Sequence, residues 1–243
     1  MLDRITLEVC VDNVDGLAAA ISGGADRIEL CSALEIGGLT PSAGLLRAAA
    51  SSPVPVVAMI RPRGGDFCFN AAEMQLMLAE IDAVADAGLQ GVVLGASLPD
   101  GELAPHTLDK LVRHAKDQGL RCTLHRAIDL CPDLAQAIRI AIDLGFERVL
   151  TSGGSRKAPE GLDGLKRCFD AAAGRIAVMP GAGIDATNVD LLRKNLSLTD
   201  VHASCSVPLP APSPQVAAFG FDTGGRRQTS REKVASLKAA LRA

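Results

Sequence analysis

The feature that most constrains the fold is an alternation of two patterns that recurs eight times along the 243 residues. Short runs rich in β-branched and aliphatic residues predict strands, and the longer Ala- and Leu-rich runs between them predict helices. Gly24, Gly88, Gly119 and Gly145 each end a predicted helix shortly before the next strand, as glycine C-caps do. The predicted strands lie at 5–11, 27–31, 54–62, 91–97, 121–127, 148–153, 176–181 and 201–206.

Eight such units of roughly 30 residues predict an α/β fold, a single (β/α)₈ TIM barrel over residues 1–243. The alternative is an open doubly wound sheet, but the first strand is not followed by the GxGxxG turn that would favour it. A Pro/Gly-rich loop at 207–228, which we expect to be non-helical, precedes a C-terminal helix at 229–242. A loop of this length fits a lid, a subunit contact or a surface segment.

The composition restricts the classes of partner that this protein is expected to bind. The net charge is −3 and the chain has neither Trp nor Tyr, so we expect no nucleic-acid partner. No apolar run is long enough to span a bilayer, so we expect no membrane partner. Residues 1–4 show no signal-peptide pattern, and seven scattered cysteines predict free thiols in a reducing compartment, which indicates the cytoplasm. A metal ion or a small anionic molecule is the expected partner.

Polar residues recur on the face of the strands that a closed barrel turns inward. The outer face must be apolar to pack against helices, so alternation places the polar members of each strand in the lumen. These members are Glu8 and Cys10, Glu29 and Cys31, Arg61, His125, Ser152 and His202. Barrel active sites lie at the carboxyl ends of strands, and unpaired buried charge is costly, so the pattern favours a functional site. The alternative is a mutually satisfied polar network that fills the barrel.

Three turns are candidate anion sites. Arg61 and Arg63 flank a proline and precede two glycines, which predicts an anion clamp with a mobile edge. Ser152–Gly153 and Gly181–Gly183 follow the sixth and seventh strands, where free backbone N–H groups could hold phosphate or carboxylate. The alternatives are solvated surface arginines and glycines that only make tight turns.

Stretches spread over the whole chain resemble the copper homeostasis protein CutC family. They are LEVCVD at 7–12, GADRIELC at 24–31, GGLTPS at 37–42, MIRPRGGDF at 59–67, HRA at 125–127, LTSG at 150–153, MPG at 179–181 and HAS at 202–204. The resemblance implies a TIM barrel and a cytoplasmic homo-oligomer, with a dimer favoured. It also implies a role in binding or handling copper, with the thiols of Cys10 and Cys31 as ligands.

Two hypotheses about function follow. In the first, Cys10 and Cys31 lie on neighbouring strands, whose backbones are about 4.8 Å apart, and their two sulfurs hold one Cu(I) ion. Cu(I) prefers soft sulfur ligands. In the second, the protein is an isomerase, lyase or hydrolase that acts on a small anionic or phosphorylated substrate. Arg61 and the glycine turns then hold the anion, and the acid/base candidates are Glu8, Glu29, His125 and His202.

Overall fold

The structure is a computed structural model that describes residues 5–222 and 224–242. Residues 1–4, on which the absence of a signal peptide was predicted, lie outside the described residues. Residue 223 of the predicted loop and residue 243 also lie outside them.

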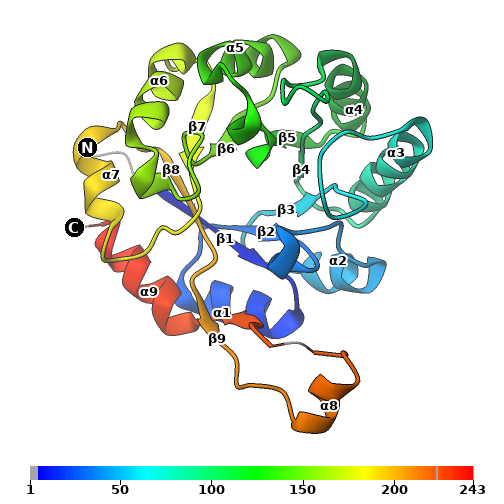
Figure 1. The fold of residues 1–243 in the computed structure, drawn as a ribbon, viewed down its shortest axis with the longest axis vertical. Helices are drawn as coiled ribbons and strands as arrows, with labels where there is room; N and C mark the ends of the chain where they lie inside the picture. The colour runs from blue at the N-terminus through cyan, green and yellow to red at the C-terminus, as the bar shows by residue number, and fades with distance from the viewer. Residues whose placement is uncertain (1–4, 223, 243) are drawn as a thin grey trace.

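Eight parallel strands form one ring in sequential order (Figure 1). The strands are β1 (Thr6–Val11), β2 (Arg27–Leu30), β3 (Val56–Met59), β4 (Gly91–Leu94), β5 (Arg121–Leu124), β6 (Arg148–Thr151), β7 (Ala177–Pro180) and β8 (Asp200–Ala203). Strand β1 shares ladders with both β2 and β8, and β7 lies beside β8 to complete the ring. The predicted TIM barrel is thereby confirmed. Most ladders end one to three residues before the predicted strand ends, so Arg61 and His125 lie just beyond β3 and β5.

Eight helices surround the strands, as expected for this fold (Figure 1). They are α1 (Val14–Gly23), α2 (Ala43–Ala49), α3 (Ala71–Asp86), α4 (Pro105–Asp117), α5 (Leu134–Leu144), α6 (Leu162–Ala172), α7 (Val189–Asn195) and α9 (Arg231–Ala240). Local signals fix their ends: Gly24 has φ 93° at the end of α1, and Asn70 with Glu73 forms a capping box on α3. In the described part of the chain, no helix has both the length and the apolarity to cross a bilayer.

The alternation along each strand separates the apolar core from the polar lumen. On β2, Ile28 and Leu30 are fully buried in the aliphatic core between strands and helices. Arg27 and Glu29, on the other face, contact side chains from β1 and β8 across the barrel interior. Short 3₁₀ helices follow some strands on the carboxyl-end side, among them η1 (Leu34–Ile36) and η2 (Arg126–Leu130), while η3 (Ala158–Glu160) precedes α6. These loops form the mouth of the barrel.

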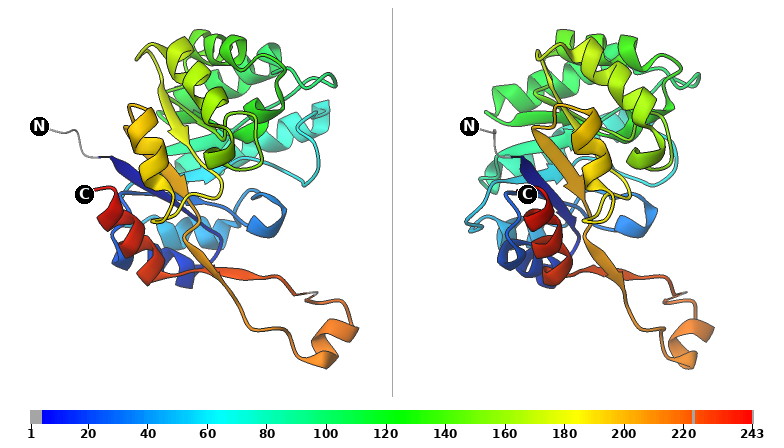
Figure 2. Two further views of the ribbon diagram at one scale, coloured as in Figure 1. Left: turned by 60° about the vertical axis from the view of Figure 1, so that its left-hand side comes forward. Right: turned by 90° about the vertical axis from the view of Figure 1, so that its left-hand side faces the viewer.

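An arm leaves the barrel between β8 and α9 and extends away from it (Figure 2). Its antiparallel strands β9 (Ser206–Pro208) and β10 (Arg227–Thr229) flank a short helix, α8 (Pro214–Ala218). The expectation of a non-helical loop was wrong here. Ser213 accepts the backbone N–H of Val216, and Pro214 occupies the first helical turn, where a missing N–H costs nothing.

Candidate functional site

The base of the lumen is a network of paired charges. The Arg27 guanidinium donates to Glu8 through Nε and to Asp200 through Nη2, at 2.7 Å. Arg148 Nε lies 3.3 Å from the same Asp200 oxygen, and its Nη1 donates to Thr123 at 3.1 Å. Burial alone would raise the pKa of Glu8, but Arg27 and His202 outweigh it and lower that pKa to about 2. Glu8 is therefore a permanently ionised structural carboxylate at neutral pH.

Glu8 also fixes the ring of His202. Nδ1 of His202 lies 3.0 Å from Glu8 Oε1, and Nε2 lies 3.5 Å from Glu29 Oε2. Burial by itself would lower the pKa of His202, but Cys10 and the two carboxylates outweigh it and raise that pKa well above its usual value. The imidazole is thus held with Nδ1 toward Glu8 and Nε2 toward Glu29.

Cys10, Glu29 and His202 form a compact cluster of potential metal ligands. One ligand atom from each lies within 4.8 Å of the others, and all three residues are buried. Strand register brings them together, because β1 pairs Cys10 with Glu29 on β2 and Glu8 with His202 on β8. Burial raises the pKa of Glu29 to about 7, against the pull of His202. Oε1 of Glu29 has no hydrogen-bond partner among the described residues.

Cys31, the second thiol expected at a copper site, lies outside this cluster. The same register that pairs Cys10 with Glu29 offsets the two cysteines along their strands. The Cys31 side chain is fully buried and packs with Val57, Met59 and Val93. Burial and the Glu29 carboxylate raise its pKa well above the ordinary value, which keeps it a protonated thiol.

A cavity of about 280 Å³ occupies the mouth of the barrel. Five of the predicted side chains, Cys10, Glu29, Arg61, His125 and His202, line it together with Gly183. Its apolar wall consists of Leu34, Met59, Phe67 and Leu150. Of the twelve predicted site residues, half therefore meet at one cavity, and Glu8 supports it from below through His202.

The two predicted clamp arginines do different things. Arg61 is 5% exposed and donates through Nη1 to the carbonyls of Ile36 (2.9 Å) and Gly38 (3.1 Å), and through Nη2 to Gly65 (2.8 Å). Its Nε is buried with no partner among the described residues. Arg63 instead pairs with carboxylates of its own loop and of α3, and it does not line the cavity. Only Arg61 faces a potential ligand.

His125 lines the cavity and carries a hydrogen-bond donor that is unpartnered in the described part of the chain. Its Nδ1 accepts the backbone N–H of Ala127 at 3.1 Å, so the ring proton of the neutral form sits on Nε2. Nε2 is buried and has no partner among the described residues. Burial and the nearby Arg61 lower the pKa of His125 to about 3, so the ring is neutral at pH 7. Gly95 makes room for it, since a Cβ there would lie 2.4 Å from the ring.

The predicted anion turn at Ser152–Gly153 is filled by the chain itself. The carboxylate of Asp129 accepts the backbone N–H groups of Ser152 (3.0 Å) and Gly154 (3.1 Å). It also accepts the hydroxyls of Thr151 and Ser152 and pairs with Arg126. An external anion would have to displace Asp129 from this turn.

The second glycine turn serves packing. The N–H of Gly181 donates to the Thr151 carbonyl at 3.0 Å, and a Cβ on Gly181 would lie 2.5 Å from the Leu150 side chain. Gly183, with φ 70°, contributes to the cavity wall. Glycine at 181 therefore leaves room for the Leu150 and His202 side chains.

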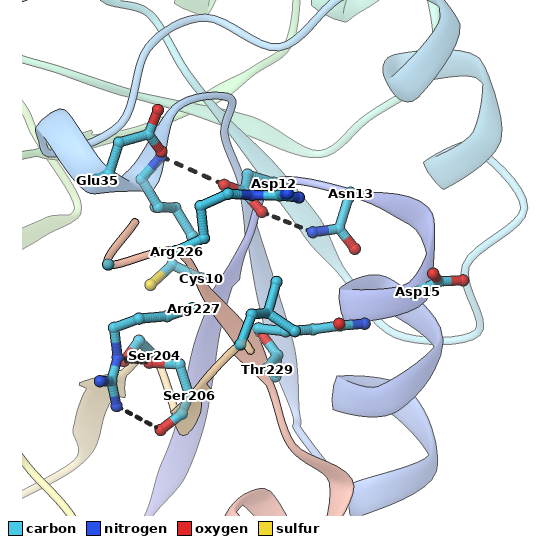
Figure 3. A pocket seen from close by; sticks show the side chains of 14 residues that line it. Cys10, Asp12, Asn13, Asp15, Glu35, Ser204, Ser206, Arg226, Arg227 and Thr229 are labelled. Atoms are coloured by element: carbon cyan, nitrogen blue, oxygen red, sulfur yellow. Dashed lines mark hydrogen bonds between the residues drawn. The ribbon is translucent and has the colours of Figure 1, made fainter. Parts of the chain in front are cut away.

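A larger cavity of about 440 Å³ lies between the barrel mouth and the arm (Figure 3). Acidic Asp12, Asp15 and Glu35 come from the barrel side, and Arg226 and Arg227 come from the arm. Arg227 is tied to the arm itself, through hydrogen bonds to Ser206. Cys10, Leu34 and Ser204 line both cavities, so the thiol lies at their border.

Sequence reasoning missed two residues that organise the site. Arg27 shares a face of β2 with Glu29, two positions away, so the parity that placed Glu29 inward also placed Arg27 there. Asp129 lies in the loop after β5, and no sequence pattern signals that its side chain reaches the next βα turn.

The geometry defines a class of protein: a TIM barrel with a buried Cys–Glu–His cluster in its mouth. The CutC family model matches residues 5–207. A CutC family protein of Rhizobium meliloti (strain 1021) is 55% identical over 240 residues, which cover 99% of this chain and 97% of that protein. A CutC family protein of Caulobacter vibrioides (strain NA1000 / CB15N) is 49% identical, over 99% of this chain and 98% of its own length. The chain belongs to the CutC family.

Among solved structures, one from Streptococcus agalactiae carries the name CutC and a suggested role in copper homeostasis. It is 29% identical, with a TM-score of 0.77, and covers 82% of this chain and 98% of its own. A thiamine phosphate pyrophosphorylase from Pyrococcus furiosus matches at 16% identity and a TM-score of 0.59, over 99% of this chain and 96% of that one, which shows a shared fold alone.

Proposed function

We propose that this protein binds one Cu(I) ion in the barrel mouth, through the Cys10 thiolate and His202 Nε2, with the Glu29 carboxylate beside them. The observation that carries the proposal is the approach of the three ligand atoms to within 4.8 Å of one another. Glu8 occupies Nδ1 of His202 and so orients Nε2, and a carboxylate on the other ring nitrogen is what metal-binding histidines usually have.

Copper suits these donors better than the other common metals. Thiolate and imidazole are ligands that Cu(I) accepts at low coordination number, whereas a structural Zn(II) site needs four ligands. The copper homeostasis named for the Streptococcus agalactiae relative supports the same choice. The sequence alone suggested Cys31 as the second ligand, but its position among Val57, Met59 and Val93 favours His202 in that role.

Anaerobic competition titrations with a Cu(I) chelator test the ligand set. The wild type should load about one ion per chain, and Cys10→Ser and His202→Asn should each bind about 100-fold more weakly, because each removes one of two strong ligands. Cys31→Ser is the matched control and should bind as the wild type does. Unchanged affinity in Cys10→Ser would sink the proposal, and an equal loss in Cys31→Ser would restore the two-thiol site.

A second candidate function is an enzyme, of isomerase, lyase or hydrolase type, that acts on a small anionic substrate. The buried donors Arg61 Nε and His125 Nε2, both unpartnered among the described residues and both lining the cavity, favour it. The acid/base role then passes to Glu29 and His202, because Glu8 is ion-paired and His125 is neutral. Turnover assays on metal-free protein, with Glu29→Gln as the inactive control, test this candidate.

We propose that the protein is a cytoplasmic homo-oligomer, with the dimer as the first candidate. The stacked rings of Phe219 and Phe221 on the arm are 70% and 82% exposed, and large exposed apolar side chains commonly mark contact surfaces. Light scattering should give a dimer mass for the wild type and a monomer mass for the double variant Phe219→Ser with Phe221→Ser. A monomeric wild type would contradict the proposal.

A further inference from the structure

Two buried donors in the mouth cavity have no partner among the described residues: Nε of Arg61 and Nε2 of His125. Both residues line the same cavity of about 280 Å³. A buried donor without a partner costs about 1–3 kcal/mol, so two of them on residues that line one cavity call for an explanation. Copper does not provide it, because a guanidinium and a ring N–H offer only donors and bind no cation.

The surroundings hold both donors in place before any ligand arrives. Three backbone carbonyls fix the guanidinium of Arg61, and the backbone N–H of Ala127 fixes the ring of His125. Phe67 packs against both, 4.9 Å from the guanidinium carbon and 4.7 Å from the imidazole centroid. Such a preorganised pair loses little entropy when it binds an acceptor.

The charge in this half of the cavity favours an anion. Among the described residues, the hydrogen-bond partners of the Arg61 guanidinium are all backbone carbonyls, so no carboxylate there neutralises it directly. His125 adds a donor without a charge, because its Nδ1 is already an acceptor. Arg126 also lines the cavity, but it is paired with Asp129. Among the described residues of the cavity wall, the one cation without a carboxylate partner and the two N–H groups match a singly charged group with two acceptor oxygens.

The size and the walls of the cavity restrict the ligand further. A volume of about 280 Å³ lies just below the range of roughly 300–1,000 Å³ typical of small-molecule sites, so the occupant must be small. Leu34, Met59 and Leu150 give it an apolar wall. A dianionic phosphate suits this cavity less well, because Arg126 in its wall is already paired with Asp129, which also accepts the backbone N–H groups of the neighbouring turn.

We propose that the mouth cavity binds a small monocarboxylate, whose oxygens accept hydrogen bonds from Arg61 Nε and His125 Nε2. Its short apolar part lies against Leu34, Met59 and Leu150. The bound molecule shares the cavity with Cys10, Glu29 and His202. This subsite goes beyond copper binding and does not depend on it, because neither donor is a metal ligand.

Thermal-shift and calorimetric titrations of metal-free protein test the subsite. The probes are acetate, propionate, butyrate and pyruvate, compared with inorganic phosphate and with chloride at equal ionic strength. We expect a saturable stabilisation by at least one carboxylate, greater than that given by phosphate or chloride.

Two substitutions at one position separate the donor from the fold. In His125→Asn the amide oxygen can replace Nδ1 as the acceptor for Ala127, while the donor at the Nε2 position is lost. In His125→Gln the amide nitrogen can replace Nε2, while the Nδ1 acceptor is lost. Carboxylate affinity should fall about tenfold in His125→Asn, the worth of one charge-assisted hydrogen bond, and should persist in His125→Gln. Arg61→Lys, which keeps the charge but loses Nε, should also weaken binding.

Several outcomes would overturn the proposal. They are the absence of a saturable response to all four carboxylates in the wild type, equal affinity in wild type and His125→Asn, and a stronger response to phosphate than to every carboxylate. Cu(I) titration of His125→Asn should match the wild type, and carboxylate titration of Cys10→Ser should do the same. Failure of the copper site and failure of the carboxylate subsite are therefore distinguishable.

Discussion

The base and the mouth of the barrel lumen both contain charged side chains, but they differ in how these are paired. At the base, Arg27 joins Glu8 and Asp200, and Arg148 donates to Thr123 while its Nε makes an ion pair with Asp200 but no hydrogen bond to any described residue. At the mouth, Glu29 Oε1, Arg61 Nε and His125 Nε2 have no hydrogen-bond partner among the described residues. Charge inside a barrel is therefore a poor indicator of a site, and unpartnered polar atoms beside a cavity are a better one.

The same strands supply both layers, so the difference comes from position along them. At the base, side chains from β1, β2, β6 and β8 converge and neutralise one another. At the mouth, Glu29 and His202 near the carboxyl ends of their strands and Arg61 and His125 just beyond theirs line a cavity. Buried charges at the base must be paired with one another, whereas polar groups at the mouth can form hydrogen bonds with solvent or a ligand.

The largest expected effect tests the base. Arg27→Met should lower the free energy of unfolding by about 3–5 kcal/mol, because it leaves the carboxylates of Glu8 and Asp200 buried without their guanidinium. Denaturant unfolding at neutral pH measures it. Arg63→Met is the matched control: it also breaks two ion pairs, but these are partly exposed to solvent, and the loss should be clearly smaller than in Arg27→Met. Equal losses in the two variants would erase the distinction between base and mouth.

The fold was predictable because apolar periodicity encodes it. The alternation that buries Ile28 and Leu30 outside the barrel also places Glu29 inside, and neither step needs long-range information. Strand register was harder to predict. One stagger of the β1–β2 ladder pairs Cys10 with Glu29 and leaves Cys31 among apolar side chains.

The pairing of charges was not predictable from parity. Parity places Arg27 inside, but only the three-dimensional arrangement shows that Arg27, and not Arg61, neutralises Glu8. The same holds for Asp129, which reaches from one βα loop into the turn of the next. Sequence patterns report which face a side chain occupies, whereas partners depend on distances across the barrel.

A second test concerns the turn at 152–154, whose backbone N–H groups already donate to Asp129. Asp129→Ala removes the carboxylate that accepts hydrogen bonds from Ser152, Gly154 and Thr151. It should cost about 3 kcal/mol of unfolding free energy, because several buried donors lose their partner. The vacated turn should then bind sulfate or phosphate, so these ions should stabilise the variant more than the wild type in thermal-shift titrations. A variant as insensitive to these ions as the wild type would show that the turn closes without Asp129.

The effect that is smallest at pH 7 concerns the mouth, and it grows as the pH falls. The folded-state pKa of His125 is about 3, below the unfolded value of 6.5, because burial and Arg61 disfavour its protonation. Below pH 6.5, His125 therefore takes up a proton in the unfolded chain but not in the folded one. The wild type loses stability as pH falls from about 6.5 towards 3. The slope from this residue is at most about 1.4 kcal/mol per pH unit.

His125→Asn removes the titrating group, so its unfolding free energy should lie within about 1 kcal/mol of the wild type at pH 7 and should fall less steeply below pH 6.5. Glu8 and Glu29 also titrate in acid, but both proteins contain them, so the difference between the two curves isolates His125. If the unfolding free energies of the two proteins followed parallel curves from pH 7 to pH 4, the ring would be charged in the folded protein. His125 would then resemble the charged side chains of the base and would not be a neutral donor.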